Sequence, residues 1–153
     1  MIEYQVENWS DMIEEGLALS YPQRHWKEVA VNQDKVPLDL DLERYHQLES
    51  QKILHVVTVR DDGKLIGYHV SIISPHLHYK STLHAMVDLY YLNPDYRRQG
   101  VGKGMFEFVE KKLVEIGVRK VYTGTKTHLS FRTLLESLGY KETEIMFTKV
   151  IGD

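Results

Sequence analysis

The segment that most constrains the fold is a basic, glycine-rich turn that separates a strand-forming run from a helical pattern. Residues 84–92 are rich in strand-forming side chains, and Asn93-Pro94 ends the run. After the turn, apolar residues repeat at helical spacing up to about Ile116, and residues 120–125 form a further strand-like run. A strand, a helix and a second strand in this order form a crossover, so the two strands are parallel if they belong to one sheet.

The rest of the chain contributes further strands and helices. A strong Asp62-Gly63 hairpin turn joins two β-rich runs, and no repeat, low-complexity tract or flexible linker interrupts the chain. We therefore expect one mixed α+β domain over residues 1–153, with residues 21–37 irregular apart from at most a short helical turn. The expected strands cover residues 2–6, 53–60, 65–74, 84–92, 120–125 and 144–150, and the expected helices cover 10–20, 38–50, the segment from the turn to 116, and 130–138.

Composition excludes several classes of protein and site. The chain has no cysteine, which excludes disulfides, thiolate metal sites and a cysteine nucleophile. No apolar run approaches the roughly 18–20 residues of a membrane span, and the N-terminus lacks the basic and apolar regions of a signal peptide. A net charge of −3 argues against a general nucleic-acid binder. We therefore expect a cytoplasmic protein with no nucleic-acid or membrane partner.

The turn itself has the composition of a phosphate-binding site. Gly100 and Gly102 allow unusual backbone angles and close approach of a ligand, and Arg97, Arg98 and Lys103 add cationic donors. The free N–H groups and positive dipole at the start of the following helix favour an anion at the same place. The alternative interpretation is a glycine-rich turn with exposed bases, but the combination favours phosphate binding.

Two common phosphate-binding motifs do not fit this turn. A Walker A loop requires glycine at the position of Arg97 and serine or threonine at the position of Gly104. A dinucleotide-binding fingerprint requires glycine at the position of Met105 and an acidic residue after the next strand, where the chain has Thr125-Lys126. The pattern therefore disfavours ATP and NAD as the ligand.

Arg97, Gly100 and Gly102 form the pattern Arg-x-x-Gly-x-Gly, which resembles the acetyl-CoA loop of the GCN5-related N-acetyltransferase (GNAT) superfamily. The preceding strand and its Pro-Asp-Tyr-Arg turn also resemble those of the family. Residues 138–140, Leu-Gly-Tyr, are similar to the family's Leu-Gly-Phe/Tyr after the last helix. The order of elements fits almost the whole chain, and residues 84–128 also resemble small acetyltransferases of phages and prophages.

The resemblance implies a central, mostly antiparallel sheet with one parallel pair of strands that splay apart, and flanking helices. It also implies acetyl-CoA as the cofactor. The loop amides would hold the pyrophosphate, and the end of the preceding strand would pair with the pantetheine arm. The residues to which the resemblance assigns acetyl-CoA binding are Tyr90, Tyr91, Leu92, Arg97, Arg98, Gln99, Gly100, Val101, Gly102 and Lys103.

The activity that the resemblance implies is transfer of an acetyl group from acetyl-CoA to a primary amine by direct attack on the thioester. An amine with a pKa of about 10.4 must first lose a proton to a base or to a water chain. Asp88 matches the family's carboxylate, on a strand face that it would share with His84, Met86 and Tyr90. Free aspartate, with a pKa of about 3.9, is a weak base that burial would have to strengthen. The alternative for Asp88 is pairing with a base or with a backbone amide.

The general acid departs from the family pattern. Many members carry a tyrosine five residues before the aromatic residue of Leu-Gly-Phe/Tyr, and the matching residue here is Leu135, which has no proton to donate. His128, at the start of the last helix, is the nearest titratable substitute, because its unperturbed pKa of about 6.5 suits proton transfer. The alternatives are a capping role for His128, a role for Tyr122 or Tyr79, and protonation by water.

The acceptor amine has no readable motif. A polyamine, an aminoglycoside-like amine, an amino acid, a protein lysine and a protein N-terminus all remain open. The resemblance places the acceptor site on the early helices, where an aromatic wall with carboxylates would suit a cation, although ordinary helix surface is the alternative. The residues concerned are Tyr21, Trp26, Asp39, Asp41, Glu43 and Tyr45.

Other functions and assemblies stay open. The alternative to an enzyme is a catalytically inactive CoA-binding module that acts through a protein partner, which Leu135 favours and Asp88 disfavours. We expect no metal, because the histidines in the middle of the chain lack a third ligand at a diagnostic spacing. A homodimer is one expected assembly, since this fold often dimerises.

Overall fold

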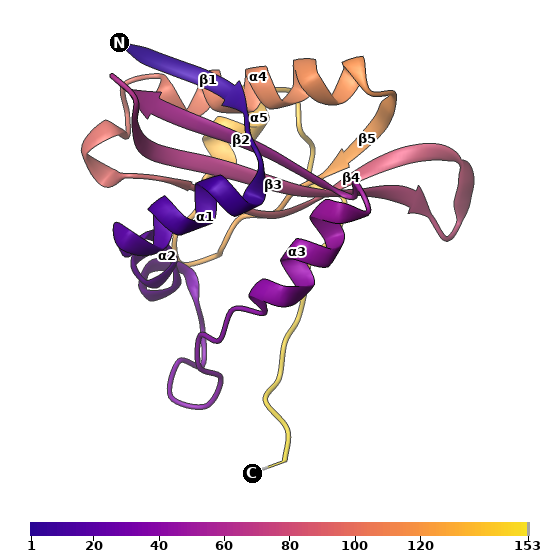
Figure 1. Cartoon of the computed structure of the whole chain (residues 1–153). Helices are drawn as coiled ribbons and strands as arrows, with labels where there is room; N and C mark the ends of the chain where they lie inside the picture. The colour runs from indigo at the N-terminus through magenta and orange to yellow at the C-terminus, as the bar shows by residue number, and fades with distance from the viewer. Residues whose placement is uncertain (153) are drawn as a thin grey trace.

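A five-stranded sheet with helices on both faces is formed by residues 1–152, the part of the chain that the computed structural model describes (Figure 1). The strand order is β1-β2-β3-β4-β5; the first three pairs are antiparallel and β4 and β5 are parallel. This confirms the mixed α+β fold with one parallel pair. The elements are β1 (Ile2–Val6), α1 (Trp9–Ala18), α2 (Tyr21–Val29), α3 (Leu42–Ser50), β2 (Leu54–Asp61), β3 (Lys64–His76), β4 (Tyr79–Leu92), a 3₁₀ helix (Pro94–Tyr96), α4 (Val101–Glu115), β5 (Val118–Tyr122) and α5 (Arg132–Ser137).

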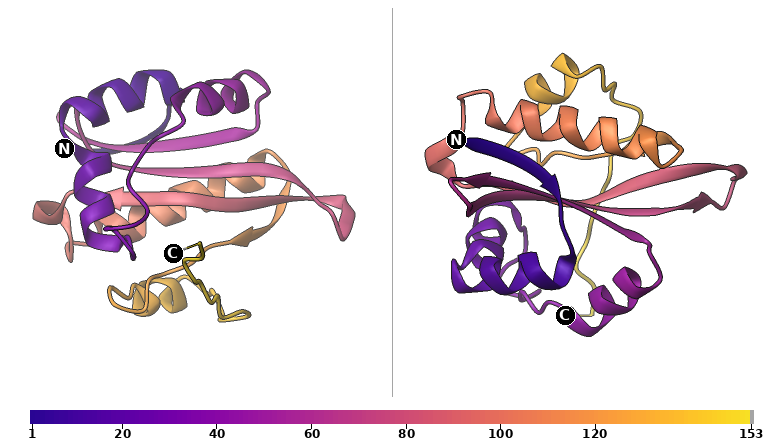
Figure 2. Two further views of the ribbon diagram at one scale, coloured as in Figure 1. Left: turned by 90° about the horizontal axis from the view of Figure 1, so that it is seen from below. Right: turned by 45° about the horizontal axis from the view of Figure 1, so that its top comes forward.

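The helices divide between the two faces of the sheet. Helices α1, α2 and α3 cover one face, and α4 and α5 cover the other (Figure 2). Trp9, Met12 and Tyr91 belong to the buried cluster of the first face, whereas Phe106 and Val109 of α4 belong to clusters on the second. Because both faces of the central strands are buried, these strands appear in the sequence as nearly continuous β-rich runs.

A β-bulge in β4 changes which side chains share a face. Val70 pairs with Leu89 and Ser71 pairs with Val87, which leaves Asp88 between them without a partner residue in β3. An extra residue shifts the alternation that follows it. The prediction that Tyr90 shares a face with Asp88 was therefore wrong: Tyr90 packs with the cluster beneath α4, on the face opposite to Tyr91.

Several boundaries differ from the sequence predictions for local reasons. The stretch expected to be mostly irregular contains the full helix α2. Helix α3 begins at Leu42 rather than at 38, because Asp41 caps it by accepting a hydrogen bond from the Arg44 N–H at 3.0 Å. The hairpin between β3 and β4 extends to the pair His76 and Tyr79, so β4 begins earlier than expected.

The prediction of a closing strand at residues 144–150 was wrong. These residues form no helix or strand, and the chain leaves α5 and ends on the side of the sheet that carries α3 (Figure 1). Within residues 1–152, β5 pairs only with β4, and its outer edge has no partner strand.

Candidate functional site

The parallel strands β4 and β5 separate partway along their length. Their pairing runs from Leu83 with Val118 to Met86 with Tyr122 and continues no further within residues 1–152. The rest of β4 keeps β3 as its neighbour on the other side. This is the splayed parallel pair that the resemblance implied, and it leaves the β5-facing edge of β4 open at its C-terminal end.

Tyr90 reaches across the region where the two strands have separated. Its hydroxyl donates a hydrogen bond to the carbonyl oxygen of Gly124 at 2.7 Å, and its ring packs edge-on against Phe106 and Phe131. Burial raises the pKa of the Tyr90 phenol. The Tyr90 side chain therefore holds the two diverging segments together beneath α4 and α5.

The turn before α4 has the backbone shape of an anion cradle. Arg98 and Gly100 both adopt left-handed angles, with φ of 63° and 79°. Gly100 is the N-cap of α4, and no side chain caps the helix start within residues 1–152. The first N–H groups of α4 therefore stay available at the positive end of the helix dipole, beside the exposed side chains of Arg98 and Lys103.

The structure requires glycine to a different degree at each of the three glycines of this segment. Gly100 provides the left-handed angle. Gly102 lies inside α4 without such an angle, which corrects the expectation of unusual geometry there; a Cβ on it would meet Leu92 at 3.8 Å, an ordinary contact. Gly104 is required by packing, because a Cβ there would lie 2.3 Å from the hydroxyl of Tyr4.

Arg97 is engaged by the protein itself. Its Nε donates to the carbonyl oxygen of Leu92 at 2.8 Å, and its Nη2 lies 2.9 Å from a carboxylate oxygen of Glu28 in α2. The guanidinium also lies over the ring of Tyr91 at 5.8 Å. Arg97 therefore fixes the turn against β4 and α2.

Asp88 lies exposed at the bulge, so it lacks the burial that the sequence analysis required of a base, and it is held by a residue from α3. The hydroxyl of Tyr45 donates to Asp88 Oδ2 at 2.5 Å, and the Tyr45 ring stacks on buried Trp9 with centroids 4.0 Å apart. Burial, with the Asp88 bond as a second cause, raises the pKa of Tyr45 and keeps its hydroxyl a donor. The sequence had assigned Asp88 to catalysis and Tyr45 to the acceptor region, and the structure brings them together.

His128 lies at a different contact from Asp88. Its Nε2 is 2.9 Å from the carbonyl oxygen of Glu28, so the segment after β5 touches the end of α2. Leu135, at the position where the family often has tyrosine, is buried in the cluster beneath α4. His128, the candidate acid, is therefore engaged by a backbone carbonyl, and the family's tyrosine position is filled by a buried apolar side chain.

The other residues expected at the acceptor site are spread apart. Tyr21 is buried and its hydroxyl donates to the carbonyl oxygen of Leu65 at 3.0 Å, so it is part of the core rather than of a substrate wall. Asp41 is used as the cap of α3. Tyr79 and Tyr122, which the sequence analysis named as alternative general acids, stack on His84 near the N-terminal end of β4.

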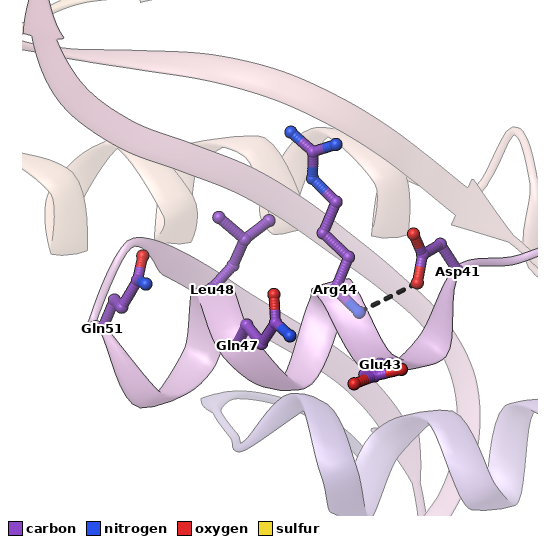
Figure 3. Close-up of a pocket in the computed structure, with 6 residues that line it drawn as sticks. All are labelled: Asp41, Glu43, Arg44, Gln47, Leu48 and Gln51. Carbon is purple, nitrogen blue, oxygen red and sulfur yellow. Dashed lines mark hydrogen bonds between the residues drawn. The ribbon is translucent and has the colours of Figure 1, made fainter.

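A polar groove of about 460 Å³ lies along α3 (Figure 3). Tyr45 is absent from its lining, so the groove faces another direction than the Asp88 contact. Within residues 1–152, no cluster of three or more histidine, cysteine or acidic side chains could hold a metal, and no helix has the length and apolarity needed to cross a bilayer. The groove is lined by Asp41, Glu43, Arg44, Gln47, Leu48 and Gln51.

Solved structures share this fold over nearly the whole chain. A predicted acetyltransferase from Clostridium acetobutylicum, solved with acetyl-CoA, is 16% identical with a TM-score of 0.73, covering 98% of this chain and 96% of that chain. An aminoglycoside acetyltransferase from an uncultured soil metagenomic sample, solved with sisomicin, is 16% identical with a TM-score of 0.70, covering 99% and 96%. A transcriptional regulator from Bacillus halodurans C-125 is 14% identical with a TM-score of 0.75, covering 99% and 100%. At such identities the likeness concerns the fold alone.

Sequence comparison with curated proteins gives no match. A family model described as the acetyltransferase (GNAT) family matches residues 13–140. That span includes the bulge, the splayed strands and the turn before α4. The match covers most of the chain, and the protein belongs to the GNAT acetyltransferase family.

Proposed function

We propose that this protein is an acetyl-CoA-dependent N-acetyltransferase that acts on a primary amine, with residues 1–153 as one catalytic domain in the cytoplasm. The observation that carries the proposal is the adjacency of two features. The start of α4, which no side chain caps within residues 1–152, is joined by the short turn after Leu92 to the strand β4, whose C-terminal edge is free of β5. One feature suits a diphosphate and the other suits an extended amide-containing arm, which are two parts of coenzyme A.

The residues around these two features fit acetyl-CoA. We assign the pyrophosphate to the N–H groups of residues 101–103, with Arg98 and Lys103 as exposed cations beside them. The pantetheine amides would pair with the free edge of β4 between the bulge and Leu92, whose carbonyl is already taken by Arg97. Acetyl-CoA supplies an acetyl group activated as a thioester.

The amine side of the reaction is assigned to Asp88. The carboxylate lies at the bulge, where β4 and β5 have separated, and Tyr45 fixes its orientation. An exposed carboxylate beside an aromatic ring attracts an ammonium group. Asp88, directly or through water, then accepts the proton that the amine must lose before its nitrogen attacks the carbonyl carbon.

The proton for the departing thiolate is assigned to solvent. Leu135 has no donor, and His128 would have to leave the carbonyl oxygen of Glu28 to reach a ligand between the strands. We therefore expect His128→Ala to retain most of the activity. A loss as large as that of an Asp88 variant would assign the proton to His128 instead.

The experiment that tests the proposal begins with thermal denaturation of the whole protein in the presence of acetyl-CoA, CoA, ATP or NAD. A ligand at about 100 times its dissociation constant stabilises a protein by about 2.7 kcal/mol. For a chain of this size, that stabilisation raises the melting temperature by several degrees. We expect a shift with both CoA species and none with ATP or NAD.

A panel of amines then identifies the acceptor class. Polyamines, aminoglycosides, free amino acids and lysine or N-terminal peptides would each be incubated with acetyl-CoA, and release of free CoA thiol would be measured. Turnover of any one class supports the enzyme. No shift with CoA would remove both the cofactor and the activity.

A second candidate function is a CoA-binding module without catalysis, and the buried apolar Leu135 is the observation that favours it. This candidate predicts a thermal shift with CoA and no turnover across the amine panel. It also predicts that Asp88→Asn does not change the release of free CoA thiol. A measurable rate that depends on Asp88 would exclude it.

A further inference from the structure

The face of the sheet that carries α3 stays open between Asp88 and the hairpin that joins β3 and β4. Met86 and His84 lie two and four residues before Asp88 on β4. Both point to this face, because Ala85 between them packs beneath α4. The Met86 side chain is 50% exposed, and the hairpin projects beyond the helices (Figure 1). A ligand bound at Asp88 can therefore continue along β4 towards the hairpin.

Strand β5 places a cation beside this path along β4. Lys120 pairs with His84 in the register of the parallel strands, and paired residues share a face of the sheet. Tyr122 pairs with Met86 in the same way. The Lys120 side chain is exposed, and its ammonium lies 4.9 Å from the centroid of the Tyr122 ring. The ring helps to hold the ammonium in position, since the face of an aromatic ring attracts a cation.

Stacked rings make this end of the path rigid. His84 is buried between two nearly parallel rings, with centroid distances of 5.8 Å to Tyr79 and 5.7 Å to Tyr122. The Thr82 hydroxyl lies 2.7 Å from His84 Nε2. A group held in this way loses little conformational freedom when a ligand binds, so Tyr122 and the ammonium over it form a prepared surface.

The charge changes sign along the path. Asp88 is the acid at one end, whereas residues 72–86 and 118–122, which form the hairpin side, contain no acidic residue. An ammonium group is attracted at Asp88, and a second cation two to four residues further along would meet Lys120. At about 3.3 Å per residue, the sign changes about 7–13 Å from Asp88. A long polyamine therefore fits this path poorly, and a molecule with an anion at that distance fits it well.

We propose that the acceptor is an extended molecule with an ammonium group at one end and an anionic group about 7–13 Å away, and that Lys120 selects the anionic group. This inference rests on the proposed acetyltransferase function and names its substrate class. The amine nitrogen at Asp88 loses one proton and forms the new N–C bond. The C–S bond of the thioester breaks, and CoA takes up one proton from solvent and leaves as a thiol. The anion pairs with Lys120 away from the reacting atoms, so Lys120 determines specificity and is not catalytic.

Two pairs of acceptors test the inference on the full chain with acetyl-CoA. One pair consists of peptides that differ only at the third residue, which is glutamate or arginine. The other pair consists of an eight-carbon ω-amino acid and an amine of the same length that ends in a trimethylammonium group. We expect the anionic member of each pair to have a KM about fivefold lower at similar kcat, because the ion pair contributes to binding alone. A difference confined to one pair also supports the inference and shows whether the anion belongs to a peptide or to a small molecule.

Charge reversal at Lys120 gives the sharper test. Lys120→Glu should reverse the preference in each pair that shows one, and Lys120→Gln should abolish it, whereas loss of a merely structural side chain would not change the sign of a preference. Arg119→Glu is the matched control, because Arg119 lines the groove beneath α4 on the other face, and it should keep the wild-type preference. An ionic strength of about 1 M should reduce the wild-type preference, since the screening length falls to about 3 Å.

The outcomes separate this inference from the proposed function. Equal KM values within both pairs, or a Lys120→Glu variant that still prefers the anionic acceptors, would overturn the inference and leave the acetyltransferase activity in place. If no acceptor released CoA thiol although CoA raised the melting temperature, the proposed function would be wrong, and this inference with it.

Discussion

The turn before α4 and the carboxylate at the bulge of β4 are the two ends of the proposed site, and they are built in opposite ways. The turn consists of consecutive residues and offers backbone N–H groups at the uncapped start of a helix. The other end joins Asp88 to Tyr45, which lie 43 positions apart, and acts through side chains. A backbone site should tolerate side-chain changes that add neither bulk nor negative charge, whereas a side-chain site should lose function with any change of its groups.

The largest effect is expected at the side-chain end. Asp88→Asn removes the proton acceptor without changing the size of the side chain. Because a positioned base contributes about 10²–10⁴-fold, we expect kcat/KM for the acceptor amine to fall by about 10²–10³-fold. The dissociation constant of CoA, measured by calorimetry, should not change.

Asp34→Asn, at an exposed acid in the segment between α2 and α3, is the matched control and should behave as the wild type. If Asp88→Asn kept full activity with the best amine, Asp88 would have no catalytic role. The proposed side-chain end of the site would then be wrong.

At the backbone end, Gly102→Asp places a carboxylate beside the first N–H groups of α4. We expect the affinity for CoA to fall by about 100-fold, equivalent to about 2.7 kcal/mol, because the new charge repels the diphosphate. Gly102→Ala is the matched control, since its Cβ would make only ordinary contacts with Leu92 and Leu134. Calorimetric titration with CoA measures the dissociation constant of each variant. If the folded Gly102→Asp variant bound CoA as tightly as the wild type, the assignment of the turn to the pyrophosphate would be wrong.

The folded state that carries both ends should lose stability in acid, because His69 is fully buried in it. Burial lowers the pKa of His69 to about 3, so the folded protein keeps this imidazole neutral while the unfolded chain takes up its proton below about pH 6.5. The contribution of His69 to the free energy of unfolding is therefore fully present above about pH 6.5 and is lost as the pH falls towards 3. Between pH 6.5 and 5 we expect a loss of about 2 kcal/mol from this group.

Urea denaturation at several pH values measures this loss. His69→Leu removes the titrating group, so its stability should depend less on pH over the same range. The prediction is contradicted if wild type and variant show the same slope.

The smallest effect is expected from the partner of the carboxylate. Tyr45→Phe removes the hydroxyl that donates to Asp88 and keeps the ring on Trp9. Loss of one charge-assisted hydrogen bond corresponds to about 1.5–3 kcal/mol at most. Because Asp88 itself remains, we expect about a tenfold fall in kcat, near 1.4 kcal/mol. A shift in the pH dependence of kcat for this variant would separate orientation of Asp88 from simple packing.

The parts of the molecule that could be predicted are those that depend on neighbours in sequence. Gly100 lies between a strand and a helix, so its left-handed angle and the helix start follow from the local pattern. The bulge at Asp88 could not be predicted, because it is a property of the pairing between β3 and β4. Nothing in the sequence pattern separates Tyr21, which enters the core, from Tyr45, which reaches Asp88.

The C-terminal segment illustrates the same limit in another way. Residues 144–150 have the side chains of a strand, and the pattern predicted one. A strand also needs an edge to pair with, and whether that edge belongs to this chain or to another is not encoded in the segment itself. The role of Arg97 was likewise hidden, since its partner Glu28 lies in a helix that the sequence pattern had indicated only as a short turn.

Glu28 has a consequence for how the two substrates would influence each other. Its carboxylate accepts from Arg97 in the turn, and its carbonyl oxygen contacts His128 after β5. Helix α2 therefore cannot move without altering a contact on each side of the opening between the strands. Coupling between two ligands is reciprocal, so any gain in amine affinity that CoA binding produces through α2 must equal the gain in CoA affinity that the amine produces. The affinity of each substrate in the presence of the other would then depend on a helix that takes no part in the chemistry.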